Sequence, residues 1–121
     1  MDSIKLKTVF GSETVIFNLK VLTVAEENKI RASTFGLKDD EKEAKEYDNI
    51  VSVLSEHSAE AAHIPTLETV EVEGGKTETK EVLKPISVRE YFQNRTAAKE
   101  RIAHTAFRAW MVALQPSYDF L

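Results

Sequence analysis

Hydrophobic and polar residues alternate along the first twenty positions of the chain. In residues 4–10 one side of the pattern holds apolar and threonine side chains, and the other holds Lys5, Lys7 and Val9. This is the two-residue period of a β-strand. Gly11-Ser12 is a turn signal, and the β-forming residues 14–19 follow it. The pattern therefore predicts an N-terminal β-hairpin.

The period then changes to that of helices. Thr23 and Glu26 have the spacing of a capping box, which predicts a helix from about Val24 to Phe35 that Gly36 stops. The almost wholly charged residues 38–49 predict a solvated start to a second helix, which should end before Ile64-Pro65. The apolar side of this second helix consists of Tyr47, Ile50, Val51, Leu54 and Ala61.

A second alternating stretch runs from Thr66 to Leu83, with Gly74-Gly75 in its middle. Two such runs around a glycine pair are typical of a β-hairpin. The alternation of Thr and Val with Glu and Lys is too polar for a buried sheet. Two interpretations of residues 66–84 remain open, a protruding two-stranded arm and a flexible loop.

The last part of the chain predicts two helices. Ser87 and Glu90 form a second capping box before a short helix, and Thr96 caps a long one from about Ala97 to Leu114. The long helix is amphipathic, with large or apolar residues at spacings of 4, 3 and 4: Ala103, Phe107, Trp110 and Leu114. The predicted fold is a single α+β domain over residues 1–121: an N-terminal β-hairpin, helices, a second polar hairpin or arm, and a C-terminal amphipathic helix.

Composition narrows the functional class. The 121 residues include no Cys, which excludes disulfides and thiolate metal sites. The net charge is −4, and the first 63 residues hold 8 basic and 12 acidic side chains. The last 36 residues are only weakly basic, which disfavours binding to nucleic acid. With no membrane-length apolar run and no export signal at the N-terminus, we expect a soluble cytoplasmic protein.

Candidate chemistry is sparse. Glu60 and His63 have the Glu-x-x-His spacing of di-metal carboxylate bundles, but those sites need a second copy of the motif. The acidic run Asp39-Asp40-Glu41 lacks the spacing and glycine of a calcium loop. No serine lies in a nucleophile elbow, and there is no glycine-rich phosphate loop. We therefore expect no catalytic residues, no metal site and no cofactor, and a protein that is not an enzyme.

Aromatic residues are concentrated at the C-terminal end, with six of the ten in the last 31 positions. They have two interpretations: they pack the last helix onto the N-terminal sheet, or they dock on another chain. An apolar chain end left in water would be an aggregation hazard, and a subunit interface would cover it. The candidate partner-binding residues are Phe107, Trp110, Leu114, Tyr118, Phe120 and Leu121.

Several stretches together resemble the tail assembly chaperones of long-tailed bacteriophages. They are a Lys-rich opening hairpin, the run from Leu22 to Ile30 (LTVAEENKI), Arg89-Glu90-Tyr91-Phe92, and the helix with Phe107-Arg108-Ala109-Trp110 before Leu114-Gln115-Pro116. The resemblance covers most of the chain as a pattern of elements, without the polar residues 66–83. In this family a short form often accompanies a longer one made by ribosomal frameshifting, and the chain is similar to the short form.

The resemblance implies a protein of the host cell cytoplasm that binds the long, helical tape measure protein and keeps it soluble during tail morphogenesis. The tail tube protein would be a second partner, and a homo-oligomer is compatible with this role. A small acidic protein suits it, since many copies could cover apolar helix faces reversibly. The alternative from another class is a structural phage tail or head–tail connector subunit, for which hairpin arms suit subunit contacts.

Overall fold

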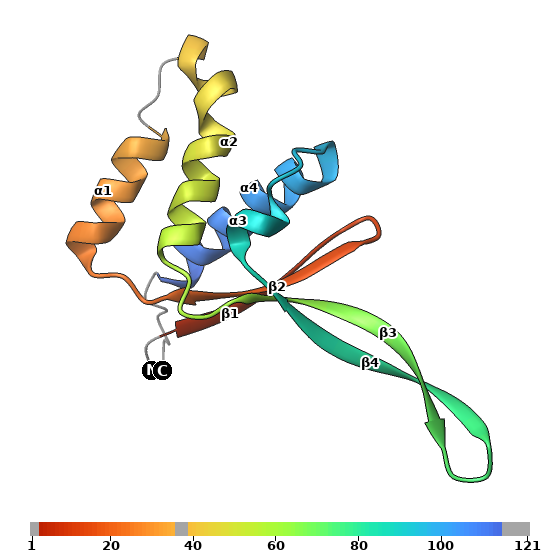
Figure 1. Ribbon diagram of the computed structural model, residues 1–121. Helices are drawn as coiled ribbons and strands as arrows, with labels where there is room; N and C mark the ends of the chain where they lie inside the picture. The colour runs from red at the N-terminus through yellow and green to blue at the C-terminus, as the bar shows by residue number, and fades with distance from the viewer. Residues whose placement is uncertain (1–2, 36–38, 115–121) are drawn as a thin grey trace, which may run out of the picture.

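The fold is α+β, as the sequence predicts, with helices on one side of a four-stranded antiparallel sheet (Figure 1). The computed structural model describes residues 3–35 and 39–114, with side chains for residues 3–34 and 45–114. The elements in chain order are β1 (Ser3–Phe10), β2 (Glu13–Lys20), α1 (Val24–Phe35), α2 (Asp39–Glu56), β3 (Ala62–Val72), β4 (Lys76–Ile86), α3 (Val88–Tyr91) and α4 (Ala97–Ala113).

The sheet consists of two long hairpins joined at a narrow point. Strand order is β1-β2-β3-β4, and the strands within each hairpin pair along their whole length. By contrast, β2 and β3 pair only at Ile16 and His63. An isolated bridge between Leu19 and Ser58, with a 2.8 Å hydrogen bond from the Lys20 amide to the His57 carbonyl, extends the contact toward α2. The two hairpins diverge beyond this junction, and the β3–β4 hairpin projects from the body as an arm (Figure 1).

Proline explains why the β2–β3 ladder ends where it does. Pro65 lies opposite Leu83 in the β3–β4 ladder, and Pro85 lies opposite His63. A proline has no amide proton, so these pairs must be the ones that exchange no hydrogen bonds across the ladder. The backbone nitrogen of Pro65, which has no proton to donate, therefore faces β2, two residues beyond His63 along β3. A continued β2–β3 ladder would lose one hydrogen bond there, and the hairpins part.

The core lies between the sheet and the helices. Alternate residues of β2 point toward the helices, and Val15, Phe17 and Leu19 are fully buried there. Helix α4 packs across the β1–β2 hairpin, chiefly against β1, with an apolar stripe that reaches 0–1 % exposure at Phe107 and Trp110. The Phe17 ring contacts Tyr91 and Phe92. The Trp110 indole N–H donates to the Lys20 carbonyl across 3.0 Å, which fixes α4 to the end of β2. The buried core is completed by Ile30, Tyr47, Ile50, Leu54, Ala62, Val88, Tyr91, Phe92, Ile102, Ala103, Ala106 and Met111.

The predicted helix starts are confirmed by their caps. The amide of Glu26 donates to the Thr23 hydroxyl at 3.2 Å, and the Thr23 amide donates back to the Glu26 carboxylate at 3.1 Å. The hydrogen bonds that the Thr23 amide and hydroxyl donate to the Glu26 carboxylate lower the pKa of Glu26. Ser87 accepts from the Glu90 amide, and Thr96 accepts from the Lys99 amide. The predicted stop at Gly36 lies outside the described residues.

The expected extent of the second helix is wrong. Helix α2 ends at Glu56, and Ala61 is exposed outside it. The chain leaves the helix because residues 57–59 hydrogen-bond to the end of β2, including a 2.8 Å bond from the Ala59 amide to the Asn18 carbonyl. The second hairpin is also longer than predicted. Pro65 and Pro85 lie inside β3 and β4 rather than beyond them, because a non-hydrogen-bonded position tolerates proline.

The contact of Trp110 with the sheet generates a stability prediction. Replacing Trp110 by Ala should lower the free energy of unfolding by about 3–5 kcal/mol, since it empties a fully buried site and removes a hydrogen bond. Val112→Ala, on the 65 % exposed side of the same helix, is the control and should change it by less than about 0.5 kcal/mol. Denaturant unfolding followed by far-UV circular dichroism measures both. Equal effects would contradict the assignment of Trp110 to the core.

Candidate partner-binding surface

Helix α4 does not present its large aromatic side chains to a partner. Phe107 is 1 % exposed and Trp110 is 0 % exposed. Their rings meet edge to face with centroids 6.4 Å apart, and the His57 ring lies 5.8 Å from that of Trp110. Both residues therefore lie in the core, as the first of the two interpretations predicts, and their side chains are not exposed for a partner. The physical reason is that the apolar stripe of α4 packs against the sheet.

The other predicted partner-binding residues divide into two groups. Leu114 is half-buried and packs against the core at the end of α4. Tyr118, Phe120 and Leu121 lie outside the described residues. The structure thus brings Phe107, Trp110 and Leu114 together as parts of one packed helix.

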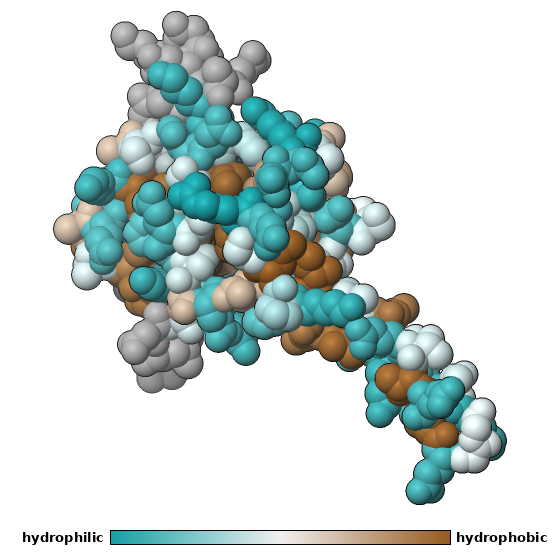
Figure 2. All heavy atoms as spheres, viewed as in Figure 1, coloured by the Kyte–Doolittle hydropathy of each residue, from teal (hydrophilic) through white to brown (hydrophobic). Residues whose placement is uncertain are grey.

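The arm carries an exposed apolar surface. Leu67 of β3 is 71 % exposed, and Leu83 of β4 is 49 % exposed. Leu83 is opposite Pro65, and Leu67 is two residues further along β3, so the two leucines are diagonal neighbours on one face of the arm. Figure 2 shows hydrophobic residues spaced along the arm between hydrophilic ones. We call Pro65, Leu67 and Leu83 the arm patch.

Charged side chains lie on both faces of the arm. Glu68 lies opposite Lys80, and Leu67 lies opposite Glu81. The Lys84 ammonium is 2.8 Å from the Glu68 carboxylate, an ion pair whose two side chains are 54 % and 39 % exposed. An exposed pair of this kind contributes little to stability. Its main effect is to favour one pairing of β3 with β4, on the face of the arm opposite the arm patch.

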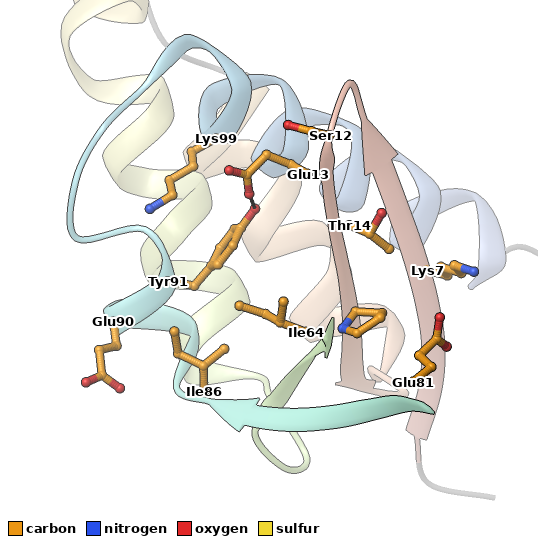
Figure 3. A pocket seen from close by; sticks show the side chains of 11 residues that line it. Lys7, Ser12, Glu13, Thr14, Ile64, Glu81, Ile86, Glu90, Tyr91 and Lys99 are labelled. Carbon is orange, nitrogen blue, oxygen red and sulfur yellow. Dashed lines mark hydrogen bonds between the residues drawn. The ribbon is translucent and has the colours of Figure 1, made fainter. Parts of the chain in front are cut away.

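A cavity of about 590 Å³ occupies the fork between the two hairpins. Its walls come from the β1–β2 hairpin, the base of the arm, α3 and the start of α4. Figure 3 shows Tyr91 and Glu13 pointing toward one another across it, with Lys99 beside them. The Tyr91 hydroxyl donates to the Glu13 carboxylate at 2.7 Å, and the Lys99 ammonium lies 5.1 Å from the centre of the Tyr91 ring. The fork thus has an apolar floor, which includes Ile64 and Ile86, and a charged rim.

Two buried tyrosines brace this region. Burial raises the pKa of Tyr91 strongly, and the hydrogen bond to Glu13 raises it further. Burial also raises the pKa of Tyr47, whose hydroxyl donates to the Phe92 carbonyl at 3.3 Å. Both phenols therefore stay neutral at ordinary pH and act as hydrogen-bond donors within the structure.

The described part of the chain offers no group of three or more His, Cys, Asp or Glu side chains placed to hold a metal ion. Glu60 precedes β3 in the chain and His63 lies within it, so the two residues are not on one helix. None of the helices among the described residues is long and apolar enough to cross a membrane.

Sequence reasoning missed the arm patch for an identifiable reason. Residues 66–83 are polar on average, and this average hides two leucines sixteen positions apart. The available signal was pairing: a turn at Gly74-Gly75 places Leu83 near Pro65 and Leu67 on the same face.

Comparison of the chain with protein-family models, with curated proteins and with solved structures found no match.

The Tyr91 hydroxyl generates a prediction about pH. Because the folded state raises the pKa of Tyr91 above the ordinary value of 10.0, the folded state holds its proton more tightly than the unfolded chain does. Stability due to this group is therefore complete below pH 10 and is lost as the pH rises further. The free energy of unfolding of Tyr91→Phe should therefore fall less steeply above pH 10 than that of the natural chain. Denaturant unfolding from pH 8 to 11 measures both. Identical slopes of the free energy of unfolding against pH would contradict a raised pKa for Tyr91. At pH 8 the same variant should lose about 1 kcal/mol, the contribution of the hydrogen bond to Glu13.

Proposed function

We propose that this chain is a phage tail assembly chaperone that binds the tape measure protein in the host cell cytoplasm and keeps it soluble during tail morphogenesis. Two lines support the proposal. The first is the residue pattern of the opening hairpin, the run from Leu22 to Ile30 and the last helix, which resembles this family. The second, which carries it, is the arm with its exposed apolar patch. The proposed role is binding alone and involves no catalysis, cofactor, nucleic acid or membrane.

The arm suits a partner that exposes apolar helix faces. Leu67 and Leu83 present a small apolar area to solvent, and acidic side chains such as Glu71 and Glu81 lie on the same face. An apolar helix would cover the leucines while these carboxylates keep the complex hydrated. A contact of this size is modest, so tail tube subunits could displace each copy as the tube grows.

A structural role in the phage tail or in the head–tail connector is the second candidate. The observation that favours it is the same arm, because a projecting hairpin with two open strand edges also suits permanent contacts between neighbouring subunits. The two roles differ in where the protein is found. A chaperone is absent from the purified virion, whereas a structural subunit is present in it.

Co-expression tests the proposed role and the arm patch together. With the natural chain, the tape measure protein of the same gene cluster should remain in the soluble fraction. Leu67→Asp should reduce that soluble fraction about tenfold, because a charge replaces an apolar contact. Val24→Asp is the matched control, since Val24 is a 74 % exposed apolar residue far from the arm, and it should leave the soluble fraction unchanged.

Thermal melting of each variant alone checks that it is folded. If the tape measure protein is equally soluble without the chain, or if the chain is found in purified virions, the chaperone proposal is wrong. If Leu67→Asp and Val24→Asp behave alike, the chaperone binds by another surface.

A further inference from the structure

The outer edge of β4 is open along the arm. In the sheet order β1-β2-β3-β4, β4 is the last strand, and no described strand lies beyond it. Residues 76–81 of β4 are all exposed. A two-stranded ribbon is marginally stable in water, and an open edge of this length is a template for another strand.

The two prolines show which backbone groups of β4 face outward. Pro65 and Pro85 both belong to odd-numbered pairs of the β3–β4 ladder, and a proline cannot donate to such a ladder. The odd-numbered residues of β4 therefore direct their amide and carbonyl groups away from β3. Along the arm these are Thr77, Thr79 and Glu81, so the outer edge offers a regular set of donors and acceptors.

We propose that β4 pairs antiparallel with β4 of a second copy of this chain, centred on Thr79, so that the two arms form one continuous four-stranded sheet. The two Thr79 residues form the central hydrogen-bonded pair. Glu78 of each copy then lies opposite Lys80 of the other, which gives two symmetric pairs of opposite charge. The inference concerns the chain alone and does not depend on the proposed function.

The charges and the turn of β4 favour this register over those centred on neighbouring residues. Centring the pair on Glu78 or on Lys80 would place two like charges directly opposite each other, and centring it on Glu81 would do the same. A pair centred on Thr77 would need the turn residues in an extended strand, whereas Gly74 and Gly75 have φ of 85° and 72°. Lysine on an edge strand ordinarily blocks pairing. Here Lys80 of one copy faces Glu78 of the other, so the charges of the edge are complementary to those of a second copy.

The proposed pairing also places the two arm patches on one surface. A two-fold axis perpendicular to the sheet keeps each face of the arm on the same side in both copies. Leu67 and Leu83 of the two copies therefore share one face of the four-stranded sheet, and the exposed apolar area doubles.

A pair of proline variants tests the edge. Thr79→Pro removes an outward donor from β4, whereas Thr69→Pro, at the residue directly opposite, removes a donor from the other edge of the same arm. Both spare the hydrogen bonds between β3 and β4. Sedimentation equilibrium should show that Thr79→Pro weakens self-association by about tenfold or more, and that Thr69→Pro changes it by less than about twofold.

Charge exchange tests the register. The background Glu68→Gln avoids a new repulsion inside the arm, where Glu68 faces Lys80. In that background, E78K alone and K80E alone should each self-associate about tenfold more weakly, because each places like charges opposite one another. An equimolar mixture of the two should recover association, since position 78 of each copy then faces an opposite charge at position 80 of the other.

Three results would overturn the proposal: a natural chain that stays monomeric at millimolar concentration, equal effects of the two proline variants, or a mixture that associates no better than its components. Circular dichroism and limited proteolysis of each variant show whether its arm is intact. If Thr79→Pro proves misfolded, the mixture decides the question on its own.

Discussion

The packing of α4 against the β1–β2 hairpin is the contact on which the rest of the structure depends. A two-stranded hairpin such as β1–β2 is marginal in water until one of its faces is buried. The apolar stripe of α4 supplies that burial at Phe107 and Trp110, and the Trp110 indole also satisfies the last carbonyl of β2 at Lys20. Helix α2, which comes between β2 and β3 in the chain, packs against α4, and α1 packs against α2.

The same arrangement leaves the arm without a core of its own. Pairing between β2 and β3 ends after Ile16 and His63, and the helices lie over the other end of the sheet (Figure 1). Beyond that point β3 and β4 have only each other, with an apolar patch on one face and an open outer edge. A natural sheet ordinarily shields such features. We propose a tape measure helix as the partner of the patch and a second copy of the chain as the partner of the edge, so the two contacts use different surfaces.

Local signals in the sequence predicted the elements well, and long-range contacts account for the errors. The caps at Thr23, Ser87 and Thr96 involve residues three positions apart, and all three were predicted. The end of α2 at Glu56 depends on hydrogen bonds with β2, nearly forty residues away in the chain, and no local pattern reveals it. The amphipathic stripe of α4 was identified correctly, but periodicity alone cannot say whether Trp110 faces a core or a partner. Likewise Leu67 and Leu83 became a patch only when the β3–β4 register was known.

We propose that the body is a stable unit and that the arm is the element that engages partners. Hydrogen exchange of the chain alone, at a concentration below self-association, and of the chain co-purified with the tape measure protein tests this directly. The account predicts that backbone amides of residues 66–83 exchange quickly in the isolated chain and become protected in the complex, while amides of β2 and α4 are protected in both. Protection gained only on the exposed side of α4, with residues 66–83 unchanged, would contradict it.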